Sequence, residues 1–252
     1  MTFDVDAAAY DAFMGRYSVL LAPQFAGLAG VTSGQRVLDV GCGTGTLTNE
    51  LVDRLGASSV SAVDPSAPFV ASVRDRYPEV DVQQAKAELL PFPDDSFDVA
   101  LAQLVVHFMS DPVAGLAEMA RVVRPGGVVA ACVWDHAGGN GPLSVFWNAA
   151  RDLDPTVEDE SALAGTREGH LKALLTTAGL REIEGGPLSV DVEHPTFEEW
   201  WEPFMLGVGP AGTYVVGLSE EEQAALREKC RGALPNAPFV LTARAWTARG
   251  LV

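Results

Sequence analysis

The chain has 252 residues, of which 48% are hydrophobic and 20% are charged. These proportions are typical of a compact globular protein and argue against a disordered chain. The formal net charge is −17. Nucleic acids and anionic membranes are bound through clustered lysine and arginine, so we expect neither as a partner.

Cysteine usage and the apolar segments bear on cellular location. Cys42, Cys132 and Cys230 lie far apart without any CxxC spacing, which predicts neither a disulfide framework nor a zinc site. The first residues lack the pattern of a signal peptide. The longest apolar stretch, roughly residues 99–109, is shorter than the ~20 residues that cross a bilayer. We therefore expect a cytoplasmic protein with no membrane span and no bound metal.

The first half of the chain alternates between helical and strand-like segments. Apolar spacing over residues 7–29 predicts one or two amphipathic helices. Strands are then expected at 36–40, 60–63, 80–83, 97–104 and 128–134, separated by helices at 47–55, 69–77 and 111–123. Apolar strands that alternate with helices predict a doubly wound, mostly parallel sheet with helices on both faces.

The rhythm changes after Trp134. A helix is expected at 170–178, a strand at 188–192, and a last strand at 239–248. Capping boxes at 196–199 and 219–222 predict two further helix starts. We therefore expect one α/β domain over 1–252. It has an N-terminal helical lid (1–30), a core (31–134), and an acceptor-side cap with closing strands (135–252), including a helical insertion before the last strand.

The most informative segment is the glycine loop at residues 37–45, with glycines at 41, 43 and 45. Glycines without Cβ atoms let a ligand lie directly on the backbone at the end of the first strand. Asp64 ends the second strand, where a carboxylate can accept hydrogen bonds from both ribose hydroxyls. A bare strand–turn–helix corner and a solvated strand-end aspartate are the alternatives. The even glycine spacing differs from the dinucleotide fingerprint G-x-G-x-x-G.

Four motifs together resemble the class I S-adenosylmethionine-dependent methyltransferases, specifically the small-molecule UbiE-like subgroup. They are residues 37–46 (VLDVGCGTGT), 63–66 (VDPS), 87–98 (AELLPFPDDSFD) and 123–128 (VRPGGV). The resemblance covers about residues 7–134. It implies a Rossmann-like fold with a seven-stranded sheet, S-adenosylmethionine as the cofactor, and S-adenosylhomocysteine as the product.

The resemblance also implies a set of cofactor contacts. Asp39 would face the methionine end, Gly41, Cys42, Gly43 and Gly45 the loop side, Asp64 the ribose, Ala87 and Glu88 the adenine, and the Gln103 backbone oxygen the ammonium. Arg16, on the lid helix, would pair with the methionine carboxylate; a solvated surface arginine is the alternative. One departure stands out: Lys86 occupies a position where relatives often carry an aspartate that accepts from the adenine amino group.

The acceptor side is less defined. His107, just past the fourth strand, is the candidate general base, with a packing histidine as the alternative. Trp134, His136, Trp200 and Trp201 are candidate acceptor contacts, and one of the adjacent tryptophans should reach a cleft or an interface. His170 and His194 are expected on the surface. The expected function is methyl transfer to a small organic acceptor. Its rivals are a nicotinamide-dependent oxidoreductase and a non-catalytic scaffold, and a homodimer remains open.

Overall fold

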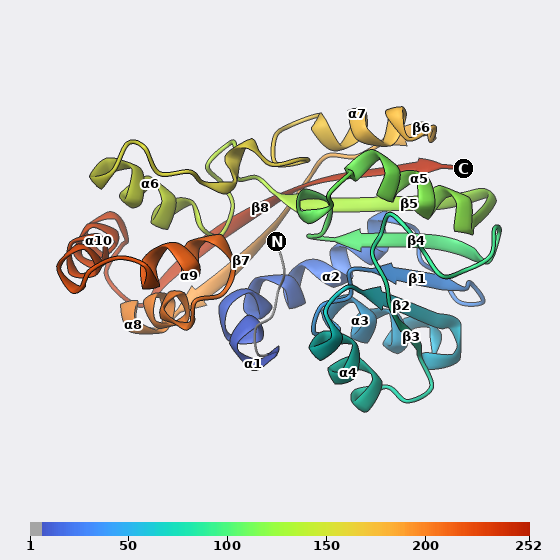
Figure 1. Ribbon diagram of the computed structural model, residues 1–252, viewed down its shortest axis with the longest axis horizontal. Helices are drawn as coiled ribbons and strands as arrows, with labels where there is room; N and C mark the ends of the chain where they lie inside the picture. The colour runs from blue at the N-terminus through green and yellow to red at the C-terminus, as the bar shows by residue number, and fades with distance from the viewer. Residues whose placement is uncertain (1–6) are drawn as a thin grey trace.

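A computed structural model describes residues 7–252 as an α/β protein built on one eight-stranded sheet (Figure 1). Residues 1–6, the start of the expected lid, lie outside the described part. The strand order is β3-β2-β1-β4-β5-β8-β6, and β7 also pairs with β8. The strands are β1 (Val37–Val40), β2 (Val60–Asp64), β3 (Asp81–Gln84), β4 (Phe97–Gln103), β5 (Val123–Trp134), β6 (Arg181–Glu184), β7 (Pro187–His194) and β8 (Phe239–Leu251).

The first five strands are parallel, and helices cover both faces of this half. On one face, α2 (Arg16–Leu28), α3 (Thr46–Leu55) and α4 (Ala67–Arg76) form an apolar core with the sheet. On the other face, α5 (Pro112–Val122) and α7 (His170–Thr177) form a second core. All four residues of β1 are buried because both faces of the strand are covered. The predicted doubly wound sheet is confirmed.

The antiparallel half is built around β8, which pairs with β5 on one edge and with β6 and β7 on the other. Gly185 and Gly186 separate β6 from β7, and β6 is the eighth strand, which the seven-stranded expectation does not include. A Cβ atom on Gly185 would lie 2.1 Å from the Thr247 carbonyl oxygen. The backbones therefore approach at this point more closely than any side chain allows.

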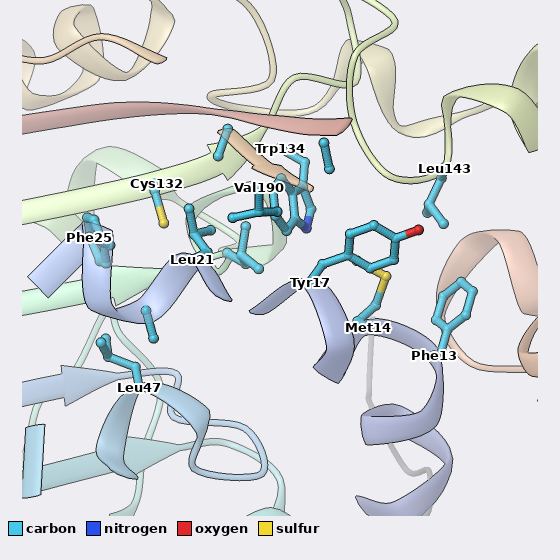
Figure 2. Close-up of a cluster of buried hydrophobic side chains, with 14 of the residues drawn as sticks. Phe13, Met14, Tyr17, Leu21, Phe25, Leu47, Cys132, Trp134, Leu143 and Val190 are labelled. Atoms are coloured by element: carbon cyan, nitrogen blue, oxygen red, sulfur yellow. The ribbon is translucent and has the colours of Figure 1, made fainter. Parts of the chain in front are cut away.

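The N-terminal segment is helical, as predicted. It consists of α1 (Ala7–Tyr10), a π-helical turn (Asp11–Gly15) and α2. Leu21 and Phe25 of α2 are fully buried, and Figure 2 shows both beside the sheet. Phe13 and Met14 lie farther along, on the side of Leu143 (Figure 2). The lid helix is thus anchored in the core at its C-terminal end and reaches the carboxyl ends of the strands at its N-terminal end.

The cap collects around the far end of the β7–β8 ribbon (Figure 1). Its helical elements are α6 (Ser144–Leu153), α8 (Phe197–Trp201), a 3₁₀ turn (Glu202–Leu206), α9 (Gly209–Val216) and α10 (Glu220–Ala233). The predicted capping box of Ser219 and Glu222 is present, with both reciprocal hydrogen bonds. Further 3₁₀ turns lie at Ala57–Ser59, Val106–Phe108 and Glu160–Ala162.

The premise that adjacent tryptophans cannot share one core is wrong, although Trp200 lines a small cavity of about 10 Å³ that also includes Arg16 and His194. Trp200 and Trp201 are both buried. Helix α8 is short and enclosed: Phe204 packs 5.0 Å from Trp200, while Phe197 stacks against Trp201 at 6.2 Å. Over residues 7–252, no helix combines the length and the apolar character needed to cross a membrane.

Candidate cofactor and acceptor site

A cavity of about 350 Å³ lies at the carboxyl ends of β1, β2 and β4, which we call the glycine-loop cavity. Parallel strands bring the loops that follow them to one edge, so residues distant in sequence meet here. Six of the predicted cofactor residues line it: Gly41, Gly43, Asp64, Ala87, Glu88 and Gln103. Asp39, Cys42 and Gly45 do not line the cavity.

The three loop glycines have φ angles of +74°, +54° and +91°, a region that side chains strongly disfavour. The Gly41 and Cys42 amides donate to the Val63 carbonyl oxygen, which ties the loop to β2. A Cβ atom on Gly41 would lie 2.5 Å from a methyl of Val105, whereas one on Gly43 would meet nothing within 4 Å. Gly41 therefore permits close packing, and Gly43 leaves room for a ligand.

Asp64 is held in a fixed orientation at the end of β2. One carboxylate oxygen accepts from the Gly43 amide at 2.9 Å and the other from the Ser66 amide at 2.8 Å. The side chain is buried, and this burial raises its pKa above the usual value despite the two backbone hydrogen bonds. The aspartate thus joins the glycine loop to β2 while lining the cavity.

Asp39 lies beneath the cavity, in the middle of the sheet. Its Oδ2 accepts from the Thr48 hydroxyl at 2.6 Å, and its Oδ1 has no partner within residues 7–252. Burial is the main cause that raises the pKa of Asp39 to about 7. A buried carboxylate with an unused acceptor is suited to a donor that arrives with a ligand or a water.

The expected adenine edge is held by Glu88. Its Oε1 accepts from the Ser110 amide at 2.7 Å and from the Asp111 amide at 3.2 Å, which fixes the loop after β4. Lys86 lines the same cavity. Gln103 donates through Nε2 to the Ser18 carbonyl at 3.3 Å, and its Oε1 has no partner among the described residues.

A second cavity of about 40 Å³, which we call the aromatic cavity, adjoins the first and shares three wall residues with it. The shared residues are Tyr10, Leu104 and Phe108; the others are Phe13, Met14, His107, Trp134, His136, Leu143, Glu160, Val208, Gly209 and Pro210. Figure 2 shows Phe13, Met14, Trp134 and Leu143 in this region. His107, Trp134 and His136, three predicted acceptor-side residues, thus come together at one cavity.

Both histidines of the aromatic cavity are held neutral. Burial, and secondly the neighbouring His136, lower the pKa of His107 well below its usual value. Burial lowers the pKa of His136 to about 4, although Asp135 acts in the opposite direction. The ring centroids lie 6.0 Å apart. The Nδ1 of His107 and the Nε1 of Trp134 are buried without a partner in the described part of the chain.

Glu160 also lines the aromatic cavity, and no sequence pattern predicted it. It is 4% exposed and lies in a polar stretch with no recognisable motif, and only tertiary packing brings it to the aromatic cavity. Its Oε2 accepts from the Trp147 indole at 2.9 Å, and burial raises its pKa to about 7. Tyr10, Phe13 and Met14 were also missed, although the predicted lid helix contains them.

Other predicted positions lie away from both cavities. The guanidinium of Arg16 contacts His194 Nδ1 at 3.2 Å, and neither cavity includes Arg16 among its lining residues. His194 is 1% exposed and also bonds the Tyr17 hydroxyl at 3.0 Å, so the expectation of a surface histidine is wrong. Strand β7 carries it under the lid helix. Trp200 and Trp201 do not line either cavity.

Within residues 7–252, no group of three or more histidine, cysteine, aspartate and glutamate side chains could hold a metal ion. The features that characterise the candidate site are therefore its glycine loop and its carboxylates. A glycine loop after β1, a carboxylate at the end of β2 and an antiparallel β8 beside β5 define the class I S-adenosylmethionine-binding methyltransferase fold.

Comparison with known proteins agrees with this class. Residues 38–131 match the family described as "Methyltransferase domain". The chain therefore carries a class I methyltransferase domain of the UbiE-like kind. Its matched segment ends before the cap and before most residues that line the aromatic cavity.

Two curated relatives are similar to this domain. The demethylmenaquinone methyltransferase of Renibacterium salmoninarum is 36% identical over 107 residues, which cover 42% of this chain and 44% of the relative. The ubiquinone/menaquinone biosynthesis C-methyltransferase UbiE of Bdellovibrio bacteriovorus is 36% identical over 105 residues, covering 40% and 45%. The chain thus spans less than half the length of these relatives.

A solved structure extends the similarity over the whole fold. Phosphoethanolamine N-methyltransferase 2 of Haemonchus contortus, in complex with phosphomonomethylethanolamine and S-adenosylhomocysteine, aligns with a TM-score of 0.59 and 18% identity. The alignment covers 97% of this chain and 57% of that one. At this identity the similarity concerns the fold.

Proposed function

We propose that the chain transfers a methyl group from S-adenosylmethionine to a small organic acceptor by in-line displacement. The observation that carries the proposal is the glycine-loop cavity. There, backbone without Cβ atoms and the fixed carboxylate of Asp64 lie at the end of the parallel strands. The adjoining aromatic cavity provides a place for the acceptor.

The residues of the glycine-loop cavity fit this cofactor. Asp64 would accept from the ribose hydroxyls, and Gly41 and Gly43 would let the cofactor lie on the backbone. The unpartnered Oδ1 of Asp39 and Oε1 of Gln103 are acceptors suited to the methionine ammonium. Ala87 and Glu88 would border the adenine, where Lys86 changes the usual contact. Cys42 and Gly45 would act by shaping the loop from behind.

When bound, S-adenosylmethionine supplies a methyl group already activated on a sulfonium, so the protein has to align the acceptor and exclude water. Tyr10, Leu104 and Phe108 form the wall common to both cavities and would bring the two ligands together. His107 and His136 are neutral in this surrounding and would shape the pocket. Trp134 would pack against the acceptor.

The comparisons support methyl transfer more strongly than any acceptor. The two curated relatives are named as quinone-pathway methyltransferases, but the matched family segment is 38–131. His136, Leu143, Glu160 and Val208 all line the aromatic cavity and follow that segment. The cap residues that would contact the acceptor therefore lie outside the segment that the relatives share.

The remaining parts of the proposal concern organisation and location. We propose a single domain in which the lid (1–30) and the cap (135–252) close over the core (31–134). The cysteines of the described chain are buried and unpaired, which fits a reducing cytoplasm. A homodimer is compatible with this arrangement and is tested by the molar mass in solution.

Calorimetry tests the function directly. We expect S-adenosylhomocysteine to bind in the micromolar range, about 8 kcal/mol at 1 μM, and NAD to give no heat. Asp64→Asn should weaken binding by a factor of about ten or more, because a charged acceptor for two hydroxyls is lost. The exposed α4 variant Asp75→Asn is the matched control. Binding of NAD alone would favour the oxidoreductase, and cofactor binding without turnover on any acceptor would favour the scaffold.

A further inference from the structure

The aromatic cavity contains little charge. Among the described residues that line it, Glu160 is the one carboxylate, and none is a lysine or arginine. Tyr10, Phe13, Phe108 and Trp134 supply aromatic walls from the lid, the loop after β4 and the end of β5. At about 40 Å³ the cavity has room for a small group, so it is suited to the polar end of an acceptor whose apolar body borders these aromatic walls.

Glu160 has an unused acceptor. Its Oε2 accepts from the Trp147 indole at 2.9 Å, whereas its Oε1 accepts no hydrogen bond from a described residue. Trp147 is itself fixed, because it is buried and its ring lies 5.1 Å from Phe146 and 5.8 Å from Tyr214. A fixed, buried carboxylate with a free oxygen is stabilised by any ligand that brings a donor.

Two further observations indicate that a polar ligand belongs here. Trp134 and His107 both line the cavity and are more than nine-tenths buried. Trp134 Nε1 and His107 Nδ1 have no partner among residues 7–252. Buried polar atoms in native proteins are nearly always satisfied, so the unpaired atoms of two residues that line the cavity favour a polar ligand there.

The negative charge of Glu160 favours some ligands of the aromatic cavity over others. An anionic group would lie near Glu160, and no lysine or arginine among the described lining residues would offset the repulsion. A neutral hydroxyl or an amino group instead meets a carboxylate that accepts its hydrogen. The chain's net charge of −17 further disfavours anions around the molecule.

We propose that Glu160 anchors the methyl acceptor, and that the acceptor is an apolar, ring-bearing molecule whose hydroxyl or amino group enters the aromatic cavity and donates a hydrogen bond to Glu160 Oε1. This inference rests on the proposed function, since the methyl donor occupies the adjoining glycine-loop cavity. It adds to that function a specific binding residue, a requirement for a donor, and an exclusion of anionic acceptors.

Calorimetry with four matched probes tests the donor requirement on the full chain saturated with S-adenosylhomocysteine. The probes are 2-phenylethanol, 2-phenylethylamine, the methyl ether of 2-phenylethanol, and 3-phenylpropanoate. We expect the alcohol or the amine to bind at least tenfold more tightly than the ether, and the anion not to bind. The tighter of the first two identifies the donor as hydroxyl or ammonium. Equal binding of ether, alcohol and amine, or preferred binding of the anion, would overturn the inference.

Three variants assign the preference to Glu160. In Glu160→Gln the single carboxamide oxygen remains with Trp147, so the amide N–H faces the cavity and the preference for donors over the ether should disappear. Trp147→Phe keeps the Glu160 carboxylate and should keep the preference for donors over the ether. If Glu160→Gln does not fold, loss of this preference in Trp147→Phe would contradict the role of Glu160. Glu158→Gln, an exposed change two residues away, should behave as wild type.

The outcome separates this inference from the proposed function. Binding of S-adenosylhomocysteine is measured beforehand, without any acceptor probe. Its absence would contradict the proposed function, and the probe preference, measured then in the unloaded protein, would still test Glu160 as a ligand-binding residue. Normal cofactor binding together with an unchanged preference and melting temperature in Glu160→Gln would leave the proposed function intact and overturn the role of Glu160.

Discussion

Burial acts in opposite directions on the titratable side chains of the aromatic cavity. It lowers the pKa of His107 well below the ordinary value, and it raises that of Glu160 to about 7. A histidine whose pKa lies far below the working pH is a weak general base, because it has little tendency to take up the proton of the acceptor. The structure places His107 at the aromatic cavity, but its protonation depends on packing that no local motif reveals.

This difference leads to a prediction for His107. Replacing a general base should cut turnover about 10²–10⁴-fold. We expect His107→Gln to lower turnover by less than tenfold. The rates of the wild type and of the variant should show the same dependence on pH around 6.5. His170→Gln, on α7, is the control. A loss of two orders of magnitude with an unchanged melting temperature would instead identify His107 as the base.

At the scale of elements, the glycine loop joins β1, β2 and the turn after β4, and two of its glycines differ in what surrounds them. Gly41→Ala combines a positive φ with a contact of 2.5 Å to Val105. We expect it to destabilise the fold by about 2–4 kcal/mol, from strain of about 1 kcal/mol plus overpacking of 1–3 kcal/mol. Val105→Ala in the same chain should recover the overpacking part. Urea unfolding measures both changes.

Gly43→Ala is the matched comparison, since its added methyl meets nothing within 4 Å. We expect only the strain of about 1 kcal/mol in stability, together with a larger loss of affinity for S-adenosylhomocysteine because the methyl enters the cavity. If both variants lose stability equally, the close approach of Val105 is not what requires a glycine at position 41.

The lid helix and β7 meet at His194. Arg16 and Tyr17 of α2 bond the two ring nitrogens, at 3.2 and 3.0 Å. We expect Arg16→Ala to lower the free energy of unfolding by about 1 kcal/mol and to leave cofactor affinity within twofold. Gln24→Ala, which removes an exposed bond from α2 to the Ser189 carbonyl of β7, should cost less. A loss of affinity without a loss of stability would show that Arg16 reaches the cofactor.

The elements that the sequence predicted well are those with strong local patterns. The parallel strands are continuous apolar runs, and Ser219 and Asp111 are caps that the structure contains. Strand β6 was not predicted, because its residues are mostly exposed and its pairing depends on the distant C-terminal end of β8. Glu160, His194 and both tryptophans of α8 were misjudged or missed for the same reason: their burial comes from segments far away in sequence.

Across the whole molecule, buried histidines and buried carboxyls have opposing effects on stability. The pKa values of His136 and His194 are lowered to about 4, and that of His107 is also lowered, each chiefly by burial. Between pH 4 and 6.5 these side chains bind protons mainly in the unfolded chain, so their contribution to stability falls as pH falls. Asp39 and Glu160, with pKa values of about 7, bind protons mainly in the folded chain over the same range. Their contribution is present at low pH and is lost as pH rises through 7.

The two effects oppose each other in the wild type, and a double variant should separate them. In Asp39→Asn with Glu160→Gln, the carboxyl contribution is gone while Thr48 and Trp147 keep an acceptor. We expect the variant to be the more stable protein above pH 7. Its advantage should shrink by up to about 2.7 kcal/mol per pH unit on acidification below 6.5, from about 1.36 kcal/mol per proton. Urea unfolding between pH 5 and 8 measures this, with Asp75→Asn and Glu158→Gln as the exposed control pair. Parallel pH curves for the variant and the wild type would mean that neither buried carboxyl takes up a proton in the folded protein.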